Sequence, residues 1–207
     1  MGIFRKFINM TRKPEGFLGK MMLRGMNSGH APMAEWALAH FPPIQPLRLA
    51  ELGCGGGRNA AMLLRRYPLA TLTAVDYSPL SVEMASAYNQ KAIEAGRCTV
   101  RQGDVSKLEW QQEAVQLATA FETIYFWPEL EKCFRQVRRI LKEDGYFIIV
   151  NELAQRNESA AKYEGLIDGM HVYTQEEINR ALLGAGFRQV RAVYHDYKPW
   201  LMMIAQK

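Results

Sequence analysis

The sequence of 207 residues contains only three cysteines, Cys54, Cys98 and Cys133. They lie far apart and form no C-x-x-C pair, so neither a disulfide framework nor a cysteine zinc site is expected. This cysteine usage fits a reducing, cytoplasmic location. Histidine is also sparse: His40 and His195 have no carboxylate or histidine at metal-ligand spacing, and no metal site is predicted.

Long apolar segments are missing as well. No apolar run approaches the roughly 18 residues that a membrane-spanning helix needs. The N-terminus, M-G-I-F-R-K, has no apolar stretch of signal-peptide length, and Lys6 stands where N-myristoylation needs Ser or Thr. We therefore expect no membrane span, secretory leader or myristoyl anchor.

The charge excess is modest, with 26 Lys and Arg against 21 Asp and Glu, a net charge of +5. Basic residues gather within 5–24 and again within 135–142, but neither group is the concentrated basic stripe of a nucleic-acid binder. The second group is interpreted as the solvated face of a helix. With 48% apolar and 23% charged residues, the composition predicts one globular domain over residues 1–207.

The sequence does contain an alternation of short apolar runs and helix-forming segments. Strands are predicted at 48–52, 71–76, 98–102, 115–120 and 146–150, and helices at 59–67, 79–95, 129–142 and 174–185. This rhythm is typical of a parallel sheet with helices on its faces. A turn is expected at 144–145, and an antiparallel hairpin from strands at about 187–195 and 200–205. Residues 1–40 look helical, and the proline-rich segment 41–46 stiffens their join to the sheet.

Four glycines stand within five positions after the first predicted strand, in E-L-G-C-G-G-G at 51–57. Glycine costs roughly 0.5–1 kcal/mol relative to alanine, and it is used where φ is positive or where another group approaches closely. Ligands of open parallel sheets bind beyond the carboxyl ends of the strands, so we expect a ligand at this loop. Asp76 ends the second strand, where a carboxylate can accept from both ribose hydroxyls of a nucleoside. Asp104, in R-Q-G-D-V after the third strand, could accept from an adenine amine, with Val105 offering its backbone.

Taken together, E-L-G-C-G-G-G, A-V-D-Y-S-P, G-D-V and the 121–152 segment with L-K-E-D-G resemble class I S-adenosylmethionine (SAM)-dependent methyltransferases, over roughly residues 45–207. The resemblance implies a doubly wound α/β fold with a mostly parallel seven-stranded sheet of order 3-2-1-4-5-7-6. Its last strand would be antiparallel, and residues 1–44 would form an N-terminal helical lid. SAM is the implied cofactor, with S-adenosylhomocysteine (SAH) as the product.

The resemblance also implies roles for individual residues. Glu51, Gly53 and Gly55 would hold the methionine part of SAM. Asp76 would hold the ribose, and Tyr77 would lie on the adenine face. The full set of implied cofactor-binding residues is Glu51, Gly53, Cys54, Gly55, Asp76, Tyr77, Asp104, Val105 and Phe121.

The methyl acceptor would lie past the fourth strand, where the sequence reads F-E-T-I-Y-F-W-P at 121–128. Clustered aromatic residues with one carboxylate are typical of a small-molecule site. The candidate acceptor-binding residues are Tyr125 and Trp127, and the candidate catalytic residues are Glu122, Glu152 after the fifth strand, and His30 in M-N-S-G-H-A-P. The alternatives are that Trp127 only packs against the next helix and that His30 is structural.

The sequence also allows other functions. G-x-G-x-x-A at 55–60 satisfies a nicotinamide-dinucleotide pattern, but that interpretation leaves Glu51, Asp104 and the hairpin unexplained. Sequence marks of DNA methyltransferases are absent, because E-T-I-Y replaces an N/D-P-P-Y/F/W loop and no P-C pair occurs. An RNA or protein methyltransferase, or a non-catalytic SAM-binding protein, remains an alternative. The favoured prediction is in-line methyl transfer to a small molecule, with nucleic acid not expected as a partner.

Overall fold

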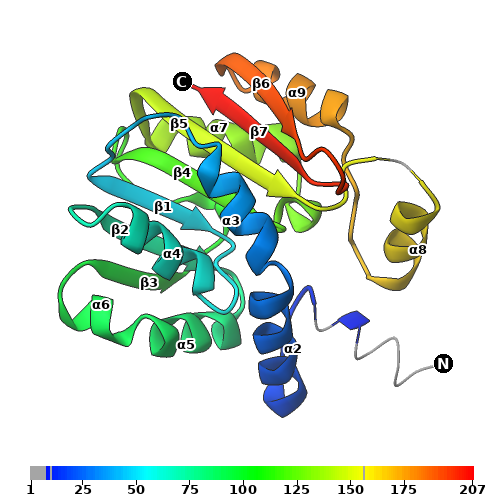
Figure 1. Ribbon diagram of the computed structural model, residues 1–207, viewed down its shortest axis with the longest axis horizontal. Coiled ribbons are helices and arrows are strands. Elements are labelled where there is room, and N and C mark those ends of the chain that lie inside the picture. The colour runs from blue at the N-terminus through cyan, green and yellow to red at the C-terminus, as the bar shows by residue number, and fades with distance from the viewer. Residues whose placement is uncertain (1–7, 10, 156) are drawn as a thin grey trace.

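The computed structural model describes residues 8–9, 11–155 and 157–207. Within these residues, seven strands form one sheet of order β3-β2-β1-β4-β5-β7-β6 (Figure 1). The strands are β1 Arg48–Leu52, β2 Thr71–Asp76, β3 Cys98–Gln102, β4 Val115–Phe121, β5 Leu141–Asn151, β6 Arg188–Tyr194 and β7 Leu201–Gln206. β7 pairs antiparallel with β5 and β6, and the remaining pairs are parallel. The predicted α/β class and strand order are confirmed.

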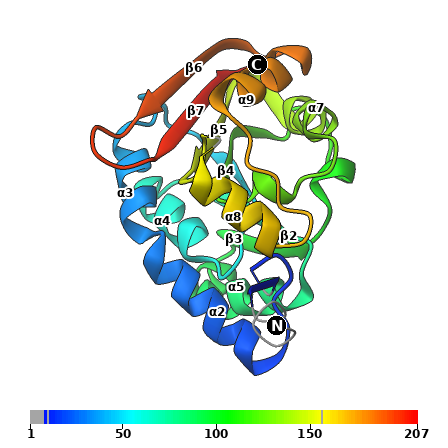
Figure 2. The same cartoon turned by 90° about the vertical axis from the view of Figure 1, so that its right-hand side faces the viewer.

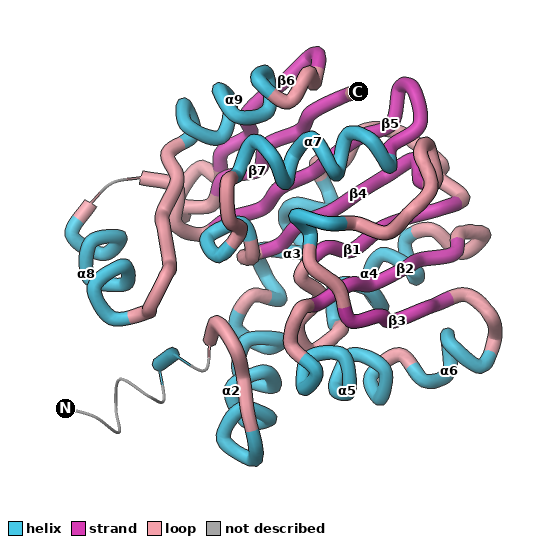
Figure 3. Tube along the Cα trace, turned by 180° about the vertical axis from the view of Figure 1, so that it is seen from behind, coloured by secondary structure: helices cyan, strands magenta, loops and turns pink. Residues whose placement is uncertain are grey.

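Helices cover both faces of the sheet, as a doubly wound fold requires. They are α2 Gly16–Gly29, α3 Ala31–Ala39, α4 Arg58–Arg66, α5 Pro79–Tyr88, α6 Gln90–Glu94, α7 Leu130–Ile140, α8 Glu158–Leu166 and α9 Gln175–Gly184. Two short 3₁₀ turns, η1 Val105–Lys107 and η2 Ile124–Phe126, follow β3 and β4. α3, α4 and α5 pack on one face, and α7 and α9 pack on the other (Figures 2 and 3).

The central strand β5 shows why both faces are covered. Phe147 and Ile149 point into the core beneath α7 and α9, while Ile148 and Val150 point into the core beneath α3 and α4. All four side chains are buried. A parallel strand that is apolar on both sides has no solvated face, so two helical layers must enclose it.

Three elements differ from the sequence-based expectations. The helix predicted at 79–95 breaks at Asn89, whose Nδ2 donates to the carbonyls of Gly57 and Ala85, both at 2.9 Å. β5 begins at Leu141, and the turn expected at 144–145 is a bulge in this strand, with Asp144 at φ +60°. α8 was not predicted, because its sequence, E-S-A-A-K-Y-E-G-L, carries little apolar periodicity.

The N-terminal segment divides into two parts. α3 belongs to the core, since Met33, Ala34 and Ala37 are almost completely buried against the sheet. α2 extends beyond the edge of the sheet, where Lys20 Nζ pairs with Glu83 Oε1 of α5 at 2.8 Å. The predicted lid at 1–44 therefore includes core structure, and residues 1–7 and 10 lie outside the described residues. Among the helices described, none has the length and apolar composition needed to cross a bilayer.

Candidate functional site

A cavity of about 310 Å³ lies at the carboxyl ends of the central strands, with α2 along one side. The predicted site residues on its wall are His30, Gly53, Cys54, Gly55, Asp76, Tyr77, Asp104, Val105, Phe121, Glu122 and Trp127. Glu51, Tyr125 and Glu152 lie next to this wall without forming it. Segments that are far apart in the sequence therefore meet at the edge of the sheet where ligands of such folds bind.

The glycine-rich loop after β1 is shaped largely by its own protein neighbours. A Cβ on Gly53, which has φ +79°, would lie 2.0 Å from Thr123 Oγ1. A Cβ on Gly56 would lie 2.4 Å from Asn27 Nδ2 of α2. Gly55 differs, because a Cβ there would meet only Leu23, at 3.9 Å. The close approach expected from a ligand is thus made by the chain itself at Gly53 and Gly56, and Gly55 faces more open space.

Two carboxylates are held beside this loop. Asp76 Oδ2 accepts from the Gly55 N–H at 2.8 Å, and Asp76 Oδ1 accepts from the Ser78 N–H at 2.9 Å. Burial raises the pKa of Asp76, and these backbone hydrogen bonds oppose the rise. Asp104 Oδ1 accepts from the Ser106 N–H at 2.8 Å. A carboxylate has about four lone-pair sites, so each group keeps acceptor capacity toward the cavity.

Glu51, at the end of β1, is fully buried behind the loop. Its Oε2 accepts from the Thr119 hydroxyl, while its Oε1 has no hydrogen-bond partner among the described residues. Burial raises the pKa of Glu51 to about 8, and the Thr119 hydrogen bond acts in the opposite direction. In the absence of a nearby cation, this carboxyl is therefore mostly protonated at neutral pH.

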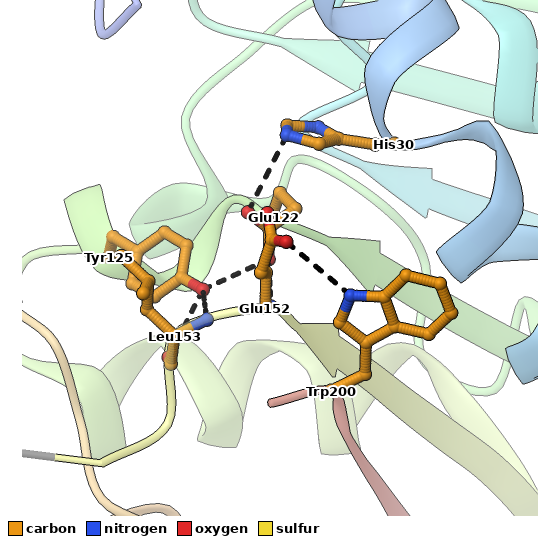
Figure 4. A network of polar contacts seen from close by, with 6 residues as sticks. All are labelled: His30, Glu122, Tyr125, Glu152, Leu153 and Trp200. Carbon is orange, nitrogen blue, oxygen red and sulfur yellow. Dashed lines mark hydrogen bonds and ion pairs between the residues drawn. The ribbon is translucent and has the colours of Figure 1, made fainter. Parts of the chain in front are cut away.

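Glu122, the first residue after β4, lies on the cavity wall. Figure 4 shows the contacts of its carboxylate. Its backbone has φ +55°, and its N–H donates to the Val150 carbonyl at 2.9 Å. Oε1 accepts from the Tyr125 hydroxyl at 2.9 Å and from the Glu152 N–H. Oε2 lies 3.9 Å from His30 Nε2. Burial raises the pKa of Glu122, with the charge of His30 and the two hydrogen bonds opposing the rise.

The two predicted acceptor-binding aromatics have different surroundings. Tyr125 is buried behind Glu122, and its hydroxyl also accepts from the Leu153 N–H at 3.0 Å, so it does not meet the expectation of a cavity-lining residue. Trp127 reaches the cavity wall, but its ring stacks on Phe147 at a centroid distance of 6.2 Å. Its indole N–H donates to Thr123 Oγ1 at 3.3 Å. Trp127 therefore both packs in the core and borders the site.

Trp200 contacts the candidate residue Glu152, and sequence reasoning did not predict this contact. Its Nε1 donates to Glu152 Oε1 at 3.5 Å (Figure 4). β7 runs antiparallel to β5, with Leu201 opposite Asn151, so the residue before β7 meets the residue after β5. The predicted hairpin contained this signal, because the start of its second strand must lie beside the end of β5.

Besides His30, the N-terminal segment contacts the site through Asn27 and Arg12. Asn27 Nδ2 donates to the Gly56 carbonyl at 3.2 Å. The Tyr77 hydroxyl donates to the Arg12 carbonyl, and Arg12 Nη1 donates to the Asp168 carbonyl at 3.0 Å. Asn27 and Arg12 were not predicted, because nothing in their local sequence indicates these distant partners.

Known proteins share parts of this sequence and this fold. Residues 50–149 match a protein family described as methyltransferase domain. The chain is 28% identical over 163 residues to malonyl-acyl-carrier-protein O-methyltransferase of Geobacter sulfurreducens, covering 74% of this chain and 60% of that protein. It is 31% identical over 101 residues to trans-aconitate 2-methyltransferase of an Enterobacter species, covering 49% of this chain and 37% of that protein.

A solved structure of a SAM-dependent methyltransferase from Aquifex aeolicus superposes with a TM-score of 0.75 at 17% identity, covering 90% of this chain and 97% of that one. The chain has the fold of class I SAM-dependent methyltransferases, and its residues 50–149 match the methyltransferase-domain family. SAM-dependent methyltransferases of this family use SAM and yield SAH. The chain spans only 60% and 37% of the lengths of the two relatives above.

Proposed function

We propose that this chain binds SAM in the cavity and transfers its methyl group to a small-molecule acceptor held beside Glu122. One observation carries the proposal: Asp76 at the end of β2, Asp104 after β3 and Glu122 after β4 line a single cavity. Asp76 and Asp104 lie on the glycine-loop side, where a nucleoside would bind, and Glu51 of β1 is buried behind that loop. Glu122 lies where an acceptor would enter.

The residues present fit SAM by their chemistry. Asp76 would accept from the ribose hydroxyls, and Asp104 would accept from the adenine amine, with Tyr77 and Val105 beside the base. The unpartnered Oε1 of Glu51 offers a buried acceptor near the methionine part. Gly53 and Gly55 keep the loop in left-handed conformations, with φ of +79° and +50°. Cys54 and Phe121 would complete the wall around the cofactor.

When bound, SAM supplies a methyl group that its sulfonium already activates. The protein then has to orient the acceptor and exclude water, and orientation of this kind can supply roughly 7–11 kcal/mol. Glu122 suits this task, because Tyr125 and the Glu152 N–H fix one oxygen and leave Oε2 to accept a proton. Tyr125 would act as a positioning residue, while His30 and Trp127 would bound the acceptor.

We also propose that α2 and residues 11–14 form a lid. They line the cavity, and Asn27 and Arg12 form hydrogen bonds with the glycine loop and Tyr77. α3 stays with the core because its inner side chains are buried. Closure of such a segment would sequester the acceptor from water.

The names of the two relatives specify malonyl-acyl carrier protein and trans-aconitate as acceptors, which supports a metabolite as the acceptor over nucleic acid. A reducing cytoplasm suits the three free, buried cysteines.

Isothermal titration calorimetry tests the cofactor part. SAM should bind the wild type far more tightly than NAD does. Asp76→Asn should weaken SAM binding at least tenfold, since hydrogen bonds to charged groups contribute about 1.5–3 kcal/mol each. Asp196→Asn, an exposed hairpin carboxylate, is the matched control and should leave binding unchanged. Unchanged SAM affinity in Asp76→Asn, or tighter binding of NAD, would overturn the proposal.

A further inference from the structure

Two carboxylates and an imidazole converge on the acceptor side of the cavity. His30 comes from the junction of α2 and α3, Glu122 from the end of β4, and Glu152 from the end of β5 (Figure 4). We infer that these three side chains bind a protonated aliphatic amine, so that the enzyme is an N-methyltransferase of amines. This inference rests on the proposed function and names its acceptor class.

The spacing of the three side chains fits an ammonium group. One ligand atom from each lies within 4.8 Å of the other two, and His30 Nε2 lies 3.9 Å from Glu122 Oε2. For three atoms at or below this spacing, a central point lies no more than about 2.8 Å from each atom, so a nitrogen placed there is within N–H···O range of all three. The same three side chains could also hold a metal ion, so the choice of a cationic nitrogen rests on the lone pairs and on the charge of the wall.

The free lone pairs also match an ammonium. Glu122 Oε1 already accepts from Tyr125 and from the Glu152 N–H, but Oε2 has only the distant His30 nitrogen. Glu152 accepts a single long bond, 3.5 Å, from Trp200. A primary ammonium has three N–H donors, one for each of the three converging acceptors when His30 is neutral.

Charge on the cavity wall points the same way. Three wall residues, Asp76, Asp104 and Glu122, are acidic. Among the described wall residues, Arg12 is the only lysine or arginine. Its Nη1 is engaged by the Asp168 carbonyl. An anionic acceptor beside Glu122 and Glu152 would meet like charges in a poorly solvated site, which costs free energy. A cationic acceptor would instead compensate the burial of Glu122.

The chemistry balances on these groups. The bound ammonium gives one proton to Glu122 Oε2, which leaves a lone pair on nitrogen. The neutral amine then turns so that this lone pair faces the methyl group in line with the C–S bond, and it forms the N–C bond as the C–S bond breaks and its electron pair stays on sulfur. The products are an N-methylammonium and SAH, and the proton on Glu122 passes to solvent. The raised pKa of Glu122 suits a carboxylate that must take up a proton at neutral pH.

A binding experiment tests this without turnover. SAH-saturated protein is titrated calorimetrically with ethanolamine, phenethylamine and tryptamine, and with the alcohol and carboxylate that match each one. At least one amine should bind at least tenfold more tightly than its alcohol and its carboxylate. Glu152→Gln should weaken that binding at least tenfold and leave SAH affinity unchanged, because the backbone N–H of residue 152 still supports Glu122.

The matched control is Glu176→Gln, an exposed carboxylate of α9 away from the cavity that should leave amine binding unchanged. Binding of no amine, equal binding of the alcohol or carboxylate, or full amine affinity in Glu152→Gln would overturn the inference. Failure here is distinguishable from failure of the proposed function. If SAH binds and labelled methyl is transferred only to neutral or anionic metabolites, the methyltransferase proposal stands and the amine inference is wrong.

Discussion

Replacing Glu51 with glutamine should change how stability depends on pH. The pKa of Glu51 is about 8 in the folded protein, against 4.5 as its ordinary value. Below pH 4.5 this carboxyl is protonated in both the folded and the unfolded chain. Between pH 4.5 and 8 the unfolded chain gives up the proton while the folded chain keeps it, so the folded state loses stability as pH rises.

The magnitude follows from this interval. At 1.36 kcal/mol per pKa unit, a rise from 4.5 to about 8 corresponds to roughly 5 kcal/mol of stability lost between the two pH values. Glutamine resembles the protonated carboxyl in shape and cannot ionise. Glu51→Gln should therefore lack this loss, and its advantage over the wild type should grow as pH rises from 5 to 8.

Urea unfolding of the cofactor-free protein at several pH values measures the effect. Asp76 and Glu122 also have raised pKa values, so they too make the fold less stable as pH rises. Their effect is the same in the wild type and in the variant. The difference between the two proteins therefore isolates Glu51. A constant cost of burying the amide would shift that difference equally at all pH values. If the difference does not change between pH 5 and 8, the assignment of a protonated Glu51 is refuted.

Three further predictions concern the loop, the lid and the acceptor side. Gly53→Ala should destabilise the fold by roughly 2–5 kcal/mol in urea unfolding, because φ is +79° and Thr123 lies in the way. The control Gly25→Ala, in open space on α2, should be neutral or stabilising; equal loss in both would contradict this. Amide exchange in α2 should slow when SAH binds while α3 changes little, and exchange indifferent to SAH would refute the lid. Glu122→Gln should lower turnover about 10²–10⁴-fold with SAM affinity nearly intact, and unchanged turnover would exclude a role as base.

Much of the fold was predictable because most of its strands are short apolar runs that alternate with helix-forming segments. β1, β2 and β3 begin and end at the predicted residues. The sheet order came from a family resemblance carried by motifs. The break at Asn89 was not predictable, because it depends on a side chain bonding to a glycine carbonyl 32 residues away. α8 was missed because its hydrophobic pattern is weak.

The site was predictable where residues follow strands along the chain. Asp76, Asp104 and Glu122 are placed by the topology itself, so their positions at one cavity follow from the strand order. Contacts between side chains of distant segments were not accessible in this way. Asn27 on the glycine loop and Trp200 on Glu152 depend on how the N-terminal helices and the hairpin pack, which local sequence does not reveal.

The most direct test of the central claim is methyl transfer itself. The purified protein is incubated with radiolabelled SAM and a cell extract, and the labelled products are sorted by molecular size and by sensitivity to RNase and protease. A protein heated to inactivity is the control. Label in small metabolites, lost in Asp76→Asn, is the predicted result. Label confined to RNase-sensitive or protease-sensitive material, or no transfer by a protein that binds SAM, would contradict the account.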